Sequence, residues 1–210
     1  MKKFGEIAFT NHVKAEQDAQ GSRDMYEGMT ARAAPDGFGE REAAFISMRD
    51  SFYMDTVSED GWPYIQHRGG PRGFLKLLSP TQLGFADYRG NRQYVSVGNL
   101  QTEKRVSLFL MEYPNRARLK LLGKARVQAA EEAPDLAAQL AMDGQGNVER
   151  LFTLDIEAFD WNCPQFITPR FTEADVAAAV APMTAELEQL RAEVAQLRAN
   201  KAPLKPEQGE

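Results

Sequence analysis

The order and spacing of short β-rich segments constrain the fold of this 210-residue chain more than any other feature. Six or seven such segments, separated mostly by turn sequences, lie at 52–57, 62–67, 74–78, 83–88, 106–112, 119–128 and 151–159. Antiparallel neighbours can be joined by a tight turn such as Asp60-Gly61, whereas parallel neighbours need a crossover of about a dozen residues or more. The spacing therefore predicts an antiparallel barrel, a mainly β fold with flanking helices.

The rest of the sequence divides the chain into four regions. Residues 1–40 are polar and interrupted by glycine and proline, so we expect an arm with one short helix. A barrel domain is expected at 41–171, with helices at about 40–50, 91–102 and 131–142, and Asn91 is predicted to be the N-cap of the second helix. A helix at 172–200 and a disordered tail at 201–210 complete the chain.

The C-terminal helix carries a heptad pattern. It opens with a capping box at 172–175, and Pro182 is expected to interrupt or restart it. Apolar residues then alternate at spacings of four and three, at Met183, Leu187, Leu190, Val194 and Leu197. Two heptads are marginal for an isolated coiled coil, so two alternatives stay open: packing on the same chain, or pairing with another chain.

Composition excludes several classes of function. The single cysteine, Cys163, cannot form an intramolecular disulfide, and with only two histidines, His12 and His67, we expect no metal site. No signal-peptide core or membrane-length apolar span is present, so a cytoplasmic protein is expected. Motifs of P-loop, dinucleotide-binding and nucleophile-elbow enzymes are missing from the sequence.

The charge is unevenly distributed along the chain. The formal net charge is -5, which argues against a general nucleic-acid binder, yet residues 62–126 carry +9 and the remainder carries -14. A basic block within an acidic chain indicates a locally bound anion.

Two clusters within this block could bind phosphate. In the first, at 84–93, a strand end, a turn and a helix start follow one another, so free backbone N–H groups meet Arg89 and Arg92. In the second, at 66–76, glycines accompany Arg68 and Lys76. The alternative for both is a surface loop with solvated basic side chains.

Three further residues are weaker candidates, each with a structural alternative. His67 could act as a general base or simply form structural hydrogen bonds. Cys163 could line a pocket or be an inert thiol, and Trp161 could stack on an aromatic ligand or serve in packing.

Taken together, the segments at 61–63, 66–70, 74–76, 85–93 and 162–165 resemble the pyridoxamine 5'-phosphate oxidase-like flavin-binding split barrels, and more narrowly their bacterial branch of flavin-nucleotide-binding proteins. The resemblance runs from about Phe4 to Phe171. It implies a six-stranded antiparallel split β-barrel that forms a homodimer, with one FMN in each of two sites at the subunit interface.

The resemblance also implies roles for particular residues. Arg92 and Gln93 behind Asn91 match the pair that grips the FMN phosphate, with Gln93 in place of the oxidase's lysine. Lys76 matches a lysine near phosphate and flavin, main chain at Ala86 and Asp87 meets the ring edge, and Arg118 matches a glutamine at the ring. The full set of expected cofactor-binding residues is Gln66, His67, Arg68, Lys76, Ala86, Asp87, Tyr88, Arg89, Asn91, Arg92, Gln93, Arg118 and Cys163.

Residues 161–165 replace the oxidase's C-terminal Arg-x-His signature, so the resemblance does not extend to oxidation of the vitamin. We therefore expect an FMN-dependent oxidoreductase that acts with an unidentified small molecule or a nicotinamide cofactor. Two alternatives are a flavin-binding or sensor module without turnover and a deazaflavin-dependent reductase. Haem handling ranks below these because no axial-ligand pattern accompanies the two histidines.

Overall fold

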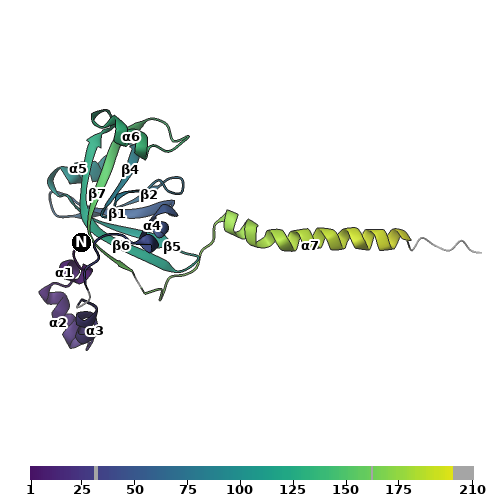
Figure 1. Cartoon of the computed structure of the whole chain (residues 1–210), viewed down its shortest axis with the longest axis horizontal. Helices are drawn as coiled ribbons and strands as arrows, with labels where there is room; N and C mark the ends of the chain where they lie inside the picture. Colours follow the sequence, from purple (N-terminus) through teal and green to yellow (C-terminus); the bar gives the residue numbers. More distant parts are fainter. Residues whose placement is uncertain (31–32, 162, 201–210) are drawn as a thin grey trace, which may run out of the picture. The chain divides into compact units, whose positions relative to one another are not determined.

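The computed structural model describes residues 1–30, 33–161 and 163–200 (Figure 1). The chain divides into two units, Met1–Ile167 and Thr168–Glu210. The predicted disordered tail at 201–210 lies outside the described residues, and so does residue 162, the first of the segment 162–165 that contributes to the family resemblance.

One antiparallel sheet dominates the first unit. Within the described residues its strands are β1 (Ser51–Val57), β2 (Pro63–Gly69), β3 (Lys76–Ser79), β4 (Gln82–Tyr88), β5 (Arg105–Glu112), β6 (Ala117–Ala129) and β7 (Val148–Trp161). Their order is β2-β1-β5-β6-β7-β4-β3, and every neighbouring pair is antiparallel. The predicted mainly β, antiparallel fold is confirmed, with seven strands rather than the six implied by the resemblance. The additional strand is β3, a four-residue edge strand that pairs with β4 alone.

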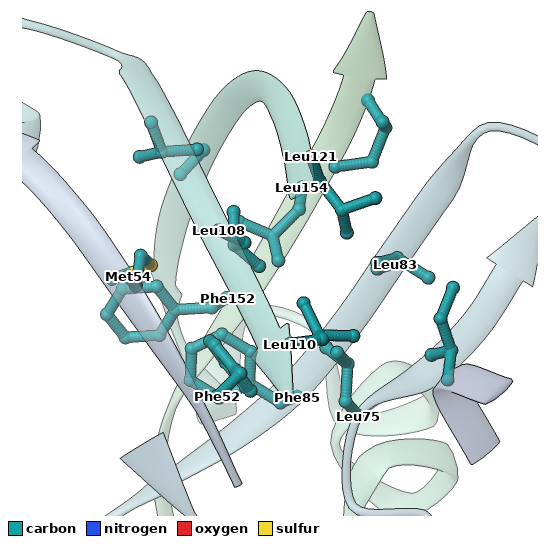
Figure 2. Close-up of a cluster of buried hydrophobic side chains, with 14 of the residues drawn as sticks. Phe52, Met54, Leu75, Leu83, Phe85, Leu108, Leu110, Leu121, Phe152 and Leu154 are labelled. Atoms are coloured by element: carbon teal, nitrogen blue, oxygen red, sulfur yellow. The ribbon is translucent and has the colours of Figure 1, made fainter. Parts of the chain in front are cut away.

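The core forms where the two ends of this strand order face one another. Phe52 of β1 lies edge-on to Phe85 of β4, with ring centroids 5.4 Å apart, and Phe85 stacks on Phe152 of β7 at 4.7 Å. Figure 2 shows these rings among buried leucines from several strands, including Leu108 and Leu154. Burial of these side chains curls the sheet into a barrel. The barrel is split because β2 and β3, the two ends of the strand order, do not pair with each other.

The helix after β4 starts later than predicted. Helix α5 (Val95–Thr102) begins four residues later than expected, and Asn91 is not its N-cap. Instead, Asn91 Oδ1 accepts a hydrogen bond from the Gln93 backbone N–H at 3.2 Å. Arg92 and Tyr94 adopt left-handed backbone conformations, with φ of 64° and 55°, which a helix cannot include. Tyr94 is the N-cap.

Two further helices flank the sheet. The segment expected as one helix at 131–142 is a 3-10 turn (Ala130–Glu132) followed by α6 (Pro134–Leu140). Pro134 separates them because proline lacks the N–H that would continue the first turn, while it suits the first position of the second helix. Helix α4 (Glu40–Ser47) lies within the predicted range and ends three residues early.

The described residues of the N-terminal arm, 1–30 and 33–40, contain three short helices where one was expected: α1 (Phe4–Ala8), α2 (Asn11–Ala19) and α3 (Arg23–Thr30). Thr10 caps α2 by accepting a hydrogen bond from the Val13 N–H, and Gly21, with φ of 69°, follows the end of that helix. Lys2 ties the arm to β7, since its N–H and Nζ donate to the backbone oxygen and the carboxylate of Glu157 at 2.7 and 2.8 Å. Hydrogen bonds from Lys2 and Lys124 lower the pKa of Glu157.

The second unit contains α7 (Glu173–Asn200). Its capping box is present, because Thr172 Oγ1 accepts from the Asp175 N–H at 3.1 Å and Asp175 Oδ2 accepts from the Thr172 N–H at 2.9 Å. Pro182 lies inside the helix, so the predicted interruption there is wrong. No helix in the described part of the chain combines the length and apolar character needed to cross a bilayer.

A glycine at an irregularity between β6 and β7 provides a test of the barrel. The register shifts between Leu122 and Gly123, and a Cβ on Gly123 would collide with the Asp155 carbonyl oxygen. We expect Gly123→Ala to lower the free energy of unfolding by about 1–3 kcal/mol in urea denaturation, because backbone cannot move aside as a flexible side chain can. Gly98→Ala, in α5 with open space around it, is the control and should raise stability by about 0.5–1 kcal/mol. Equal effects would contradict the strand register.

Candidate functional site

A charged cluster lies where the apolar core ends. Side chains alternate between the two faces of a strand, so Phe85 and Asp87 of β4 share a face. They pair in register with Phe152 and Arg150 of β7. The stacked phenylalanine pair is thus followed, two residues along each strand, by an aspartate and an arginine.

Arg68 of β2 completes this cluster from the opposite end of the strand order. Its Nη1 donates to Asp87 Oδ1 at 2.7 Å, while Arg150 Nε donates to Asp87 Oδ2 at 2.9 Å. The Arg68 guanidinium carbon lies 4.9 Å from the centroid of the Phe152 ring. The side chains of Arg68 and Asp87 are only 14% and 12% exposed. One carboxylate therefore joins two guanidinium groups in a sheltered environment.

The groups around Arg150 stabilise its charge. Burial by itself lowers the pKa of Arg150, but hydrogen bonding to Asp87, the charge of Asp87, hydrogen bonding to Tyr94 and the charge of Glu149 outweigh it, so the pKa is raised above its ordinary value. The same guanidinium lies 4.6 Å from the centroid of the Tyr94 ring. Arg150 is thus a fixed cation at the end of the core.

A cavity of about 120 Å³ opens beside the cluster. It is lined by residues of β2, β4, the loop after β4, the start of α5 and the start of β7: Tyr64, Gln66, Arg68, Asp87, Tyr88, Gly90, Asn91, Arg92, Gln93, Tyr94, Val95, Ser96, Val97 and Arg150. The charged members of this lining are three arginines and one aspartate, a net charge of about +2 for the described lining.

Backbone and side-chain donors add to this positive character. The N-cap of α5, Tyr94, makes no side-chain capping hydrogen bond, and the first residues of the helix line the cavity. N–H groups in the first turn of a helix have no partner within the helix and carry the positive end of its dipole. Arg68 Nε is buried and has no hydrogen-bond partner among the described residues. These N–H groups are available to an acceptor bound in the cavity.

The structure brings seven of the predicted site residues to this cavity: Gln66, Arg68, Asp87, Tyr88, Asn91, Arg92 and Gln93. Two others lie on strands that line it but face the other way. His67 follows Gln66 on β2 and lies edge-on to the ring of Tyr53, at 5.5 Å, and Ala86 packs in a small cluster with Leu140 and Leu151. Strand alternation places both on the face opposite to Arg68 and Asp87.

The remaining four predicted residues lie elsewhere. Lys76 donates to the carbonyl oxygens of Gln139 and Ala141, at 2.7 and 3.4 Å, near the end of α6. Arg89 is exposed after β4, and Arg118 of β6 lies over the Phe109 ring at 4.8 Å, with its Nε buried and unpartnered among the described residues. Cys163 is exposed and lines a second cavity, of about 650 Å³, with residues of the arm and of β7.

Sequence reasoning missed Tyr64, Tyr94, Ser96 and Arg150 at the first cavity. Ser96 is buried, and its hydroxyl donates to Gln66 Oε1 at 2.7 Å, which holds that side chain in place. Tyr64 could have been found from its spacing, since it lies two residues before Gln66 on the same face of β2. Arg150 lies 63 residues after Asp87, and only the strand register brings the two together.

The family model for pyridoxamine 5'-phosphate oxidase matches residues 38–154, more than half of the chain. The chain belongs to the pyridoxamine 5'-phosphate oxidase family. The matched segment contains β1 to β6, the start of β7 and every residue that lines the cavity. No curated protein sequence matches the chain.

Solved structures similar to this family member share little sequence with it. HupZ of Group A Streptococcus is 14% identical with a TM-score of 0.47, over 64% of this chain and 99% of HupZ. A candidate pyridoxamine 5'-phosphate oxidase of Lactobacillus delbrueckii is 18% identical with a TM-score of 0.46, over 60% of this chain and 95% of that protein. HutZ, the heme storage protein of Vibrio cholerae, is 14% identical with a TM-score of 0.36, over 56% and 89% of the two chains.

The Arg68 to Asp87 ion pair can be tested by its effect on stability. Arg68→Met keeps an apolar stem over the phenylalanine rings but leaves Asp87 with Arg150 alone. We expect a loss of about 1–3 kcal/mol in the free energy of unfolding, the usual cost of a charged hydrogen-bond partner removed from a sheltered site. The control is Arg126→Met, whose side chain is 72% exposed and pairs with Asp155, and which should change stability by less than about 1 kcal/mol. Losses of the same size would contradict the bridging role of Arg68.

Proposed function

We propose that this chain binds FMN, that the phosphate of FMN occupies the first cavity, and that the protein is an FMN-dependent oxidoreductase. The observation that carries this proposal is the excess of positive charge in the lining of the cavity, where Arg68, Arg92 and Arg150 outnumber the single carboxylate of Asp87. A phosphate monoester carries about -1.5 to -2 charges at neutral pH, so it matches this excess.

The donors of the cavity also suit a phosphate. Guanidinium groups form paired hydrogen bonds to phosphate oxygens, and helix N-termini bind anions through their free N–H groups. The unpartnered Arg68 Nε supplies a donor that a phosphate oxygen would satisfy. Membership of the pyridoxamine 5'-phosphate oxidase family supports a flavin nucleotide over other phosphate esters.

The size of the cavity supports a site shared between two chains. At about 120 Å³ it is much smaller than the roughly 300–1,000 Å³ of pockets that enclose a whole drug-sized ligand. We therefore place only the phosphate end inside and the isoalloxazine outside, against a second copy in a homodimer. A second copy would cover two exposed apolar side chains: Trp62, 76% exposed, and Ile65, 66% exposed, which strand alternation places on the face of β2 opposite to Arg68. Arg118, with its unpartnered Nε, is the candidate contact to the ring of the flavin held by the other copy.

The chain's own residues bind and orient the cofactor. When bound, the isoalloxazine supplies hydride and electron transfer, chemistry that no side chain offers. None of the described residues that line the cavity is a histidine, glutamate or cysteine, and Asp87 is held by two arginines. The protein therefore contributes binding and positive potential at this cavity. The substrate is an unidentified small molecule or a nicotinamide cofactor.

The phosphate assignment is tested by comparing FMN with riboflavin, which lacks the phosphate, in fluorescence titrations. Arg92→Ala should weaken FMN binding about 10- to 150-fold, because a charge-assisted contact of about 1.5–3 kcal/mol is lost. Riboflavin binding should not change, since riboflavin has nothing for Arg92 to contact. Arg126→Ala is the matched control and should leave both affinities unaltered. The proposal fails if Arg92→Ala weakens FMN and riboflavin equally, or neither.

Turnover is tested by stopped-flow mixing of the FMN-loaded protein with NADH and with NADPH. An oxidoreductase that uses a nicotinamide cofactor should lose its flavin absorbance rapidly with one of the two. Persistent absorbance with both, despite tight FMN binding, would favour the flavin-binding or sensor module instead. Tight binding of a deazaflavin cofactor with weak binding of FMN would favour the deazaflavin-dependent reductase.

A further inference from the structure

Helix α7 carries an exposed apolar stripe along its length. None of its side chains is buried, and seven apolar residues are between 42% and 65% exposed: Val176, Val180, Met183, Leu187, Leu190, Val194 and Leu197. Successive members are separated by four and three residues in strict alternation, which is the heptad repeat of a coiled coil. Because the helix continues through Pro182, the repeat gains Val176 and Val180 and spans about three heptads.

The stripe has the residue types of a two-stranded coil. In heptad notation Val180, Leu187 and Val194 occupy the a positions, and the other four residues of the stripe occupy the d positions. Two of the three a positions are valine and two of the four d positions are leucine, and branched residues at a with leucine at d favour two strands in a parallel coil. Pro182 occupies a c position, away from the stripe, where its ring meets no partner helix.

The charges beside the stripe select one arrangement of the partner. Glu186 and Glu193 occupy the g positions, and Arg191 and Arg198 occupy the e positions. In a parallel, in-register pair each g residue faces the e residue five positions further along the other helix, so Glu186 faces Arg191 and Glu193 faces Arg198. In an antiparallel pair, e faces e and g faces g, which would place arginine against arginine and glutamate against glutamate. None of these four side chains has an ion-pair partner within the described part of this chain.

We infer that α7 pairs with α7 of a second copy of this chain as a parallel, in-register, two-stranded coiled coil. This pairing goes beyond the proposed flavin function and does not depend on FMN binding. Three heptads are marginal for two separate helices, but the barrel dimer proposed above would hold the helices at high effective concentration, so the pairing rests on that dimer.

Disulfide cross-linking of the full-length chain tests the direction of pairing. With Cys163 replaced by serine, Leu197→Cys places a thiol in the stripe, and Ala199→Cys places one at an outward f position near the same end of the helix. A parallel coil brings the two Leu197 positions within disulfide range, so mild oxidation should link Leu197→Cys about tenfold more than Ala199→Cys. Equal yields would overturn the inference. An antiparallel coil, which would also overturn it, pairs a with d positions and would instead link Leu197→Cys to Val180→Cys in a mixture.

Charge reversal tests the partner and the pairs. In the Leu197→Cys background, one variant carries Glu186→Arg with Glu193→Arg, and a second carries Arg191→Glu with Arg198→Glu. In a homodimer of either variant, like charges face each other at the e and g positions, so cross-linking should fall about tenfold. Co-expression of the two variants brings opposite charges together and should restore cross-linking in a mixed dimer. Tags of different size tell the two chains apart. The inference is contradicted if co-expression gives no more mixed dimer than chance, or if neither variant loses cross-linking. Loss of FMN binding would leave these results unchanged, so the two proposals fail separately.

Discussion

The carboxylate of Asp87 is the point on which the barrel and its cavity both depend. Backbone hydrogen bonds run from β2 through the sheet to β3, and the two edges do not pair. Across that split, Asp87 of β4 accepts a hydrogen bond from Arg68 of β2, while its other oxygen accepts one from Arg150 of β7, the strand beside β4 in the sheet. Side-chain hydrogen bonds thus link β2 to β4, two strands that no backbone hydrogen bonds join. The phenylalanine cluster packs next to these side chains.

The same bridge gives the site its charge. The Asp87 carboxylate neutralises only one of the two positive charges of Arg68 and Arg150. Arg92 in the neighbouring loop and the first turn of α5 add to the remaining positive charge. Burying such groups without full compensation is costly unless an anion completes the arrangement. The structural need for closure and the proposed binding of a phosphate are therefore met by the same residues, which links ligand binding to the stability of the barrel.

Local signals predicted much of this structure. The Asp60-Gly61 turn holds because Gly61 adopts a φ of 84°, and the two basic clusters lie at strand ends, as their composition indicated. Sequence-based prediction failed for contacts between residues far apart in the chain and for the face of the strand on which a residue lies. Arg150 joins Asp87 only through strand register, whereas His67 and Ala86 are turned away by the two-residue alternation of their strands. The late start of α5 depends on two left-handed residues that no local pattern marked, and Pro182 is accommodated inside α7.

We propose that the cavity beside Asp87 receives the phosphate of a flavin nucleotide. The most direct measurement is a crystal structure of the full chain grown with FMN. We expect the phosphate beside Arg68, Arg92 and the first turn of α5, with Arg68 Nε as a donor to one of its oxygens. Bound FMN whose phosphate lies outside this cavity would rule out the proposed phosphate site.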